Sequence, residues 1–270
     1  MTKAYTQSWK KFAEQYLYTV SPSTPSKQDM KIIEPYVKKI LKKKPDILIL
    51  GCTIAYRKLM AKYNLHVDMV DINKIMYKVN TSALTDIKRK EKFIQDNWFT
   101  MRLKKKYDLI LGDFVINNIP LNMRDKFYKN VKKHLKDGGL FITRVYNFGI
   151  KNKIGEKFIK EYKNKAVTRR ALSELWWDSI FQFGFNTKTK VLHNRKGFLE
   201  LKKQVKKYPY MKKWVRLYEE RLPITKKSWA VLTDSQQEKE LKKQFKLITT
   251  KYAKDYKYHE ICPTYILSRK

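Results

Sequence analysis

A glycine and an aspartate twenty positions apart most constrain how this chain can fold. The apolar run 47–50 ends at Gly51, and a second apolar run ends at Asp71. This spacing is typical of a strand, a tight turn, a helix and a second strand whose tip carries a carboxylate. A carboxylate at that tip can accept hydrogen bonds from both hydroxyls of a ribose. The sequence therefore predicts a site for a ligand that contains a nucleoside.

Short apolar runs alternate with amphipathic segments through the first half of the chain. The predicted strands are 47–50, 66–70, 92–94, 107–111 and 140–145, and the predicted helices are 54–63, 74–84 and 123–135. Runs that are apolar at every position are typical of strands buried on both faces. We therefore expect an α/β fold with a Rossmann-like, doubly wound, mostly parallel sheet. Asp137, Gly138 and Gly139 are expected to cap the third helix and turn into the fifth strand.

Helical patterns precede this core. Apolar residues recur at helical spacing over 5–18, where Trp9 and Tyr16 are expected on the buried face of a helix and, as the alternative, over a substrate. Ser26 is then expected to cap a second helix that ends near residue 41, and Pro35 should bend it or end it early.

The second half of the chain changes character. Residues 151–250 read as mostly helical, with Asp234 or Ser235 capping a last Lys-rich helix, and strand-like sequence returns at 256–261 and 265–267. We expect four parts: N-terminal helices at 1–45, a ligand-binding core at 46–150, a long helical insertion at 151–250 that serves as a substrate cap, and final strands at 251–270 that rejoin the sheet.

The net charge of +36 raises the question of nucleic-acid binding. The 61 basic and 25 acidic residues are spread evenly, since residues 1–150 hold 30 and 13 of them. Lysine supplies 50 of the basic residues, and lysine lacks the planar fork with which arginine reads phosphates. The charge alone therefore leaves RNA or another polyanion as a possible partner.

The remaining composition points to a reducing compartment. Two cysteines, Cys52 and Cys262, cannot build a disulfide framework. No apolar run is long enough to cross a bilayer, and the first residues lack the apolar segment of a signal peptide. The four histidines show no metal-ligand spacing, so no metal site is expected. We expect a cytoplasmic protein without membrane contact.

Polar residues recur where the predicted strands end. Gly51 and Asp71 end the first two strands, Asp96 follows the third, and Asp113 and Asn117 follow the fourth. Ligands of open α/β sheets bind beyond the carboxyl ends of the strands. Read one at a time, Asp71 could equally cap the next helix and Asp96 could be a turn residue. Their joint order favours one shared site.

At this point the chain resembles the class I S-adenosylmethionine-dependent methyltransferases over residues 46–146. The resemblance is carried by the segments 47–51, 70–71, 95–98, 108–113 and 135–142. It is closer to an uncharacterised branch of that family, in which the glycine loop reads Leu-Gly-(Val or Cys)-Thr. The segments 22–26 and 262–263 also look similar to that branch.

The resemblance implies S-adenosylmethionine as cofactor and assigns roles residue by residue. Gly51, Cys52 and Thr53 would lie along the methionine part, and Asp71 with Ile72 along the ribose. Asp96, Asn97 and Trp98 would hold the adenine, and Asp113 with Asn117 would face the methionine part or the substrate. The family's usual loop has further glycines where this chain has Thr53 and Ala55, which leaves the cofactor less room.

The sequence names no acceptor and no strong catalytic group. Asp113 and His193 are the candidates for a general base. A small-molecule acceptor is the favoured substrate; an RNA-directed methyltransferase that uses the basic surface, or a non-catalytic nucleic-acid-binding or scaffold protein of the same fold, are the alternatives.

Overall fold

A seven-stranded sheet forms the centre of the molecule, as seen in a computed structural model that describes residues 3–149 and 156–270, with side chains from Lys10 onward. The strand order is β3-β2-β1-β4-β5-β10-β9. The strands are β1 (Ile47–Leu50), β2 (His66–Asp71), β3 (Lys90–Gln95), β4 (Tyr107–Asp113), β5 (Leu135–Arg144), β9 (Phe245–Lys251) and β10 (Thr264–Arg269).

The first five strands are parallel, and β10 runs antiparallel to both β5 and β9. The order reverses between β1 and β4, where open α/β sheets form their ligand crevice. The sequence prediction of a Rossmann-like, mostly parallel sheet is confirmed.

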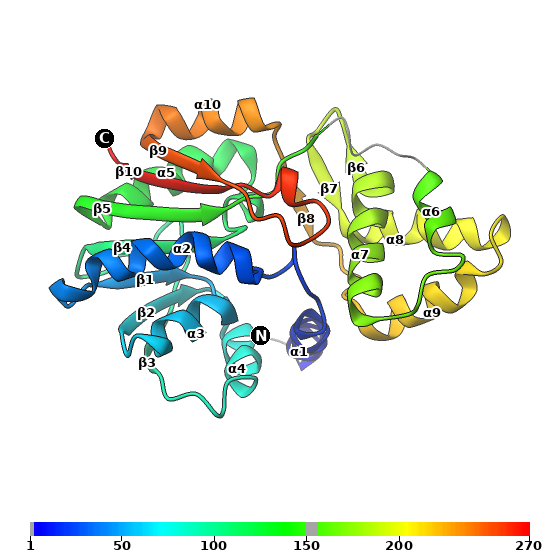
Figure 1. The fold of residues 1–270 in the computed structure, drawn as a ribbon, viewed down its shortest axis with the longest axis horizontal. Helices are drawn as coiled ribbons and strands as arrows, with labels where there is room; N and C mark the ends of the chain where they lie inside the picture. Colours follow the sequence, from blue (N-terminus) through cyan, green and yellow to red (C-terminus); the bar gives the residue numbers. More distant parts are fainter. Residues whose placement is uncertain (1–2, 150–155) are drawn as a thin grey trace.

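Helices cover both faces of the sheet (Figure 1). They are α2 (Lys27–Ile40), α3 (Ile54–Lys62) and α4 (Lys74–Ser82) together with α5 (Arg124–Lys133) and α10 (Asp234–Gln244). Ile47 and Ile49 pack into the core beneath α2 and α3, whereas Leu48 and Leu50 pack with α5 and α10. The run Ile47–Leu50 is apolar at every position because each face of the strand is buried.

The N-terminal segment follows its predicted pattern with one exception. Helix α1 spans Lys3–Leu17, and Ser26 and Asp29 form the expected capping box of α2. Pro35 does not end α2, which continues to Ile40. The burial of Ile33 and Val37 against the sheet offsets the backbone hydrogen bond that proline lacks. The side chain of Trp9 lies outside the described part.

Two expected turns are placed differently. Helix α5 ends at Lys133, and Asp137, Gly138 and Gly139 lie inside β5, where the pairing with β4 shifts between Tyr107 and Leu109. They form a bulge rather than a helix cap. The cap of α10 is Thr233, one residue before Asp234.

Of the two last strands predicted, 265–267 is confirmed within β10 and 256–261 is wrong. Residues 256–261 form a turn and the short 3-10 helix His259–Ile261, because Tyr258 adopts a left-handed φ of 69° that no strand accommodates. The strand is instead β9, which we had predicted as helix. Its lysines interrupt the apolar pattern typical of a strand, and charged residues of this kind are common on edge strands. The four-part division of the chain stays a prediction.

The inserted region between β5 and α10 has a core of its own. Its elements are α6 (Lys157–Glu161), α7 (Arg169–Ser179), the π-helix Ile180–Gly184, α8 (Asn194–Lys203), α9 (Met211–Arg221) and the small antiparallel sheet of β6 (Phe185–Asn186), β7 (Val191–His193) and β8 (Ser228–Ala230). Sequence analysis missed this sheet. Phe114 and Tyr146 from the main sheet's loops complete the core, so the two regions are packed together.

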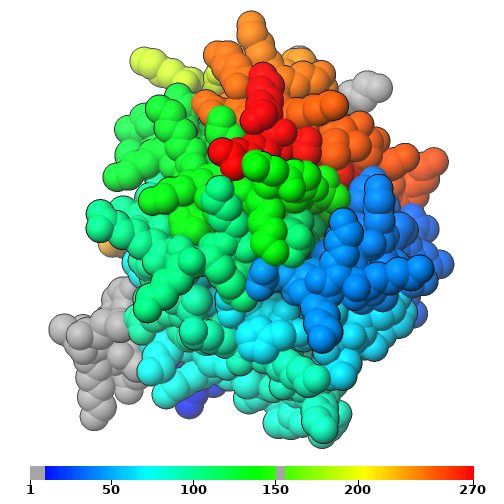
Figure 2. Space-filling view, turned by 90° about the vertical axis from the view of Figure 1, so that its left-hand side faces the viewer, coloured from blue at the N-terminus to red at the C-terminus, as the bar shows by residue number. Residues whose placement is uncertain are grey.

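Segments distant in sequence lie side by side on the face of the molecule that points away from the inserted region. Figure 2 shows α2, in blue, beside the orange and red C-terminal segments. At the start of α2, where Asp29 pairs with Arg144 at the end of β5, Gln28 contacts the loop after β9: its backbone N–H donates to Asp255 Oδ2, and its side chain accepts from the N–H of Lys254 at 2.7 Å. Within the described ranges, no helix has the length and apolar character needed to cross a bilayer.

Candidate functional site

A cavity of about 380 Å³ lies at the carboxyl ends of the parallel strands. These ends face the inserted region, and α1 lies between the two (Figure 1). We call the two walls of the cavity the sheet half and the aromatic half. The sheet half includes Gly51, Cys52, Thr53, Asp71, Ile72, Asn73, Asn97, Trp98, Phe99 and Asp113. The aromatic half includes Phe12, Tyr16, Phe114, Tyr146, Trp176, Trp177, Lys227 and Trp229.

Gly51 forms the floor of the sheet half. Its N–H donates to the carbonyl of Val70 at 2.8 Å, and its φ is +89°, a conformation that L residues other than glycine rarely adopt. A Cβ placed on Gly51 would lie 3.8 Å from Asp71 Oδ2 and 3.8 Å from Trp98 Cζ2. Two sequence-predicted side chains thus converge on this glycine.

Asp71 is oriented by the start of α4. Its Oδ1 accepts from the N–H of Asn73 at 2.8 Å, and Asn73 caps α4 through its own side chain. The alternative that Asp71 is the helix cap is therefore wrong. Burial raises the pKa of Asp71 to about 6, and the Asn73 hydrogen bond and the positive charge of Lys227 oppose that rise. Ile72, 64% exposed, lies at the mouth of the cavity.

The turn after β3 is held by its own side chains. Asp96 Oδ1 accepts from the N–H of Asn97 at 2.6 Å, and Asn97 Oδ1 accepts from that of Phe99. The Trp98 indole donates to the carbonyl of Val70 at 2.8 Å. Asn97, Trp98 and Phe99 line the cavity, whereas Asp96 is not among the lining residues. Phe99 is a residue that sequence analysis missed.

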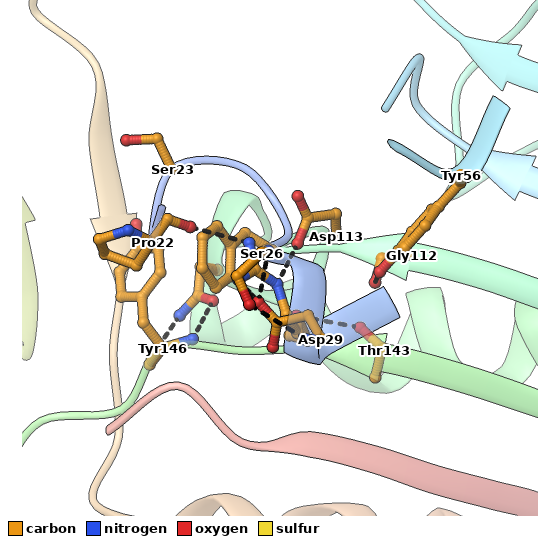
Figure 3. Close-up of polar contacts among 12 residues, drawn as sticks. Pro22, Ser23, Ser26, Asp29, Tyr56, Gly112, Asp113, Thr143 and Tyr146 are labelled. Atoms are coloured by element: carbon orange, nitrogen blue, oxygen red, sulfur yellow. Dashed lines mark hydrogen bonds and ion pairs between the residues drawn. The ribbon is translucent and has the colours of Figure 1, made fainter. Parts of the chain in front are cut away.

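Asp113 belongs to a buried ion network (Figure 3). Arg144 donates from Nε to Asp113 Oδ1 at 2.8 Å and from Nη1 to Asp29 Oδ2 at 2.7 Å. Its Nη2 donates to the carbonyl of Pro22 at 2.8 Å. Burial raises the pKa of Asp113 to about 6 against the lowering effect of Arg144. The network fastens the N-terminal segment to the end of β4.

Two predicted site residues lie away from the cavity wall. Asn117 donates to the carbonyls of Tyr146 and Ala230 and accepts from the N–H of Tyr146, so its amide joins three chain segments. His193 ends β7, where it pairs with Ser228 of the small sheet. Neither is among the residues that line the cavity.

The aromatic half was largely missed from the sequence. Trp176 and Trp177 are adjacent in α7, and both are 2% exposed and both line the cavity. Phe114 and Tyr146 directly follow β4 and β5, so the rule applied to strand ends could have found them. No sequence motif near Lys227 or Trp229 predicts a site residue. The fold of the inserted region places both of them at the cavity.

The arrangement matches a widely used fold. No protein-family profile and no curated protein matches the sequence. Among solved structures, the CcbJ methyltransferase of Streptomyces caelestis aligns with a TM-score of 0.61 and 9% identity over 97% of each chain. The glycopeptide N-methyltransferase MtfA in complex with S-adenosylmethionine gives 0.51 and 11%, over 88% of this chain and 93% of MtfA.

A candidate Zn-dependent alcohol dehydrogenase from Rhodobacter sphaeroides also aligns, with a TM-score of 0.56 and 15% identity over 100% of this chain and 99% of the other. At such identities the likeness concerns the fold. The fold is the Rossmann-like fold of S-adenosylmethionine-dependent methyltransferases.

Proposed function

We propose that this protein is an S-adenosylmethionine-dependent methyltransferase with a small-molecule acceptor. The observation that carries the proposal is the convergence of Gly51, Asp71 and Trp98 on one cavity at the point where the strand order reverses. A nucleoside site needs a close backbone approach, a carboxylate for the ribose and a flat surface for the base. These three residues supply one each.

The lining residues fit the parts of the cofactor. Asp71 would accept hydrogen bonds from the ribose hydroxyls through its Oδ2, and Trp98 with Phe99 would cover the adenine. Gly51, Cys52 and Thr53 would lie along the methionine part, near Asp113. The roles of Asp96 and Asn117 as ligands stay predictions, since other polar groups already engage their side chains.

The dehydrogenase alternative fits less well. A dinucleotide loop would place glycines where this chain has Thr53 and the buried Tyr56, which leaves a pyrophosphate little room. In the part of the chain that the structure describes, no three His, Cys, Asp or Glu side chains are grouped so as to hold a metal ion.

The proposed chemistry asks little of the protein beyond positioning. When bound, the cofactor would supply a methyl group activated by a positively charged sulfur. The chain's own task is to align an acceptor and exclude water, which the enclosed aromatic half suits. Asp113 is held by Arg144, and His193 lies away from the cavity, so neither is placed as a free general base.

Calorimetric titration with S-adenosylmethionine and S-adenosylhomocysteine tests the proposal. We expect micromolar binding of both and a higher melting temperature in their presence, because a ligand that binds only the folded state stabilises it. A parallel titration with NAD should give no heat. Absence of heat and of thermal shift with both sulfur compounds would contradict the proposal.

The net charge of +36 keeps an RNA acceptor as a second candidate. RNA would have to present a single unstacked base to this cavity. A filter-binding titration over a range of salt concentrations, with single-stranded RNA and with heparin, separates the two cases. RNA binding that matches heparin binding at each salt concentration would show attraction by charge alone.

A further inference from the structure

The aromatic half is built as a wall of mutually packed rings. The ring centres of Tyr146 and Trp177 lie 5.2 Å apart, those of Trp176 and Trp177 5.1 Å, and those of Trp176 and Trp229 6.1 Å, all edge to face. Phe114 packs edge to face on Tyr146 at 4.7 Å. Edge-to-face packing leaves ring faces and edges for a further flat ring to contact.

Two polar atoms in this wall have no partner among the described residues. The hydroxyl of Tyr146 and the indole Nε1 of Trp176 are buried and make no hydrogen bond. Two other buried indoles are satisfied: Trp177 donates to Ser23 Oγ at 2.9 Å, and Trp214 donates to the carbonyl of Tyr162 at 3.2 Å. An unsatisfied buried donor costs about 1–3 kcal/mol, so such atoms usually serve a ligand or a water molecule.

Both atoms are donors under physiological conditions. Burial raises the pKa of Tyr146 well above its ordinary value, so its hydroxyl keeps its proton. The indole nitrogen can only donate. Both atoms can therefore pair with an acceptor atom on the ligand, such as a carboxylate oxygen, and the indole of Trp176 can pair with nothing else.

Lys227 adds a positive charge to the same half. Its ammonium lies 5.6 Å from the ring centre of Phe12 and 5.8 Å from that of Trp229. Burial lowers its pKa to about 8, although the negative charge of Asp71 opposes this. No ion pair with a carboxylate is recorded for Lys227 among the described residues. By contrast, the comparably enclosed Lys257 lies 2.9 Å from Asp178.

We propose that the acceptor is a small aromatic carboxylate, whose ring packs against Trp176, Trp177 and Trp229, and whose negative charge is balanced by Lys227. Tyr146 and Trp176 would donate to its oxygen atoms. Only the role of this ligand as methyl acceptor rests on the proposed methyltransferase function. The binding site itself is argued from these residues alone.

Both features of the ligand follow from the wall. A flat ring gains edge-to-face contacts that an aliphatic ring of equal size cannot make. A negative charge relieves the cost of holding an ammonium group among aromatic rings without an ion pair. A neutral amide of the same shape would present one acceptor oxygen instead of two and would leave the charge of Lys227 unbalanced.

Calorimetry without cofactor tests the site directly. The probes are salicylate, 4-hydroxybenzoate and 2-naphthoate, with the corresponding amides as neutral counterparts and cyclohexanecarboxylate as the non-aromatic anion. We expect at least one aromatic acid to bind about tenfold or more tightly than its amide, as one charge-assisted contact provides, and more tightly than cyclohexanecarboxylate, which lacks the aromatic ring contacts.

Lys227→Met should remove this preference and leave amide binding within about twofold. Lys226→Met is the matched control, because it makes the same change of charge one residue away at an exposed position and should leave the preference intact. Tyr146→Phe should weaken acid binding several-fold, and circular dichroism should show that each variant is folded.

The outcomes separate this site from the cofactor proposal. No binding of any of the three acids at millimolar concentration, equal binding of acids and amides, or an unchanged preference in Lys227→Met would each overturn the aromatic carboxylate. So would a Lys227→Met variant that loses S-adenosylhomocysteine instead, because Lys227 would then hold the cofactor. If an aromatic acid binds while S-adenosylhomocysteine does not, the site stands and the methyltransferase function falls.

Discussion

The two halves of the cavity are built in different ways. The sheet half consists of residues at the ends of β1, β2, β3 and β4 or within four positions after them, so each is positioned by the strand beside it. The aromatic half gathers Phe12, Tyr146, Trp176 and Trp229 from segments as much as 217 positions apart. The contrast teaches that the proposed cofactor site can be encoded locally, while the proposed acceptor site beside it depends on how an insertion packs.

The halves also differ in charge. The sheet half contains the carboxyl groups of Asp71 and Asp113, each with a pKa raised to about 6. The aromatic half contributes the ammonium of Lys227. A ligand that fills the sheet half should favour ionised carboxylates, whereas a ligand of the aromatic half should bring a negative charge. Variants that affect one half and spare the other test this division.

The largest effect on stability should come from removing Arg144, which pairs with Asp113 of the sheet half and lies 4.5 Å from the ring centre of Phe114 in the aromatic half. Arg144→Met would leave Asp29 and Asp113 buried without their shared cation, and we expect a loss of about 3–5 kcal/mol in the free energy of unfolding. Urea unfolding measures it. Arg269→Met removes an exposed ion pair with Asp137 and should cost less than about 1 kcal/mol. Equal losses of unfolding free energy in Arg144→Met and Arg269→Met would show that the buried network stabilises the protein no more than an exposed ion pair does.

The next effect should fall on the sheet half alone. Gly51→Ala forces a side chain into a φ of +89° and places a methyl group beside Asp71 and Trp98, so S-adenosylhomocysteine binding should fall below detection. Gly138→Ala is the matched control, since Gly138 also has a positive φ, of 75°, but its Cβ would meet nothing within 4 Å.

Both glycine variants should lose about 1–2 kcal/mol of unfolding free energy, because alanine is disfavoured by that amount in the left-handed backbone conformation. Only Gly51→Ala should lose the ligand in calorimetry. Normal binding by Gly51→Ala would place the cofactor away from this glycine.

A smaller effect is expected from removing the carboxylate of β2. Asp71→Ala should weaken S-adenosylhomocysteine binding by about 1–3 kcal/mol through the lost ribose hydrogen bonds. Asp96→Ala is the comparison variant, because Asp96 is not among the lining residues. An Asp96→Ala variant that loses more affinity than Asp71→Ala would reverse the roles assigned here.

The smallest effect should be a dependence of cofactor binding on pH. Ribose hydroxyls donate to an ionised carboxylate, so binding lowers the pKa of Asp71 from about 6 and releases a proton. Affinity should therefore be constant above pH 7 and fall below pH 6, by at most about tenfold per pH unit. Calorimetry in buffers of different ionisation enthalpy counts the protons. Asp71→Asn should show a flat profile between pH 5 and 7, and a dependence that persists in it would point to Asp113.

Sequence reasoning succeeded where local chemistry decides the structure. The capping box of Ser26 and Asp29, the apolar run Ile47–Leu50 and the turn at Gly51 each depend on neighbours a few positions away. It failed at β9, whose exposed lysines mimic a helix, and at residues 256–261, whose buried tyrosines mimic a strand but pack against the inserted region.

The sequence by itself determined the sheet and the order of the polar groups at its edge. A strand buried on both faces must be apolar throughout, and its end must turn toward the ligand crevice. Only the tertiary structure decided the part of the aromatic half that the insertion supplies, the shared cation Arg144 and the position of Lys227. Those contacts join residues far apart in the chain, and no local pattern records which distant surfaces must meet to bury them.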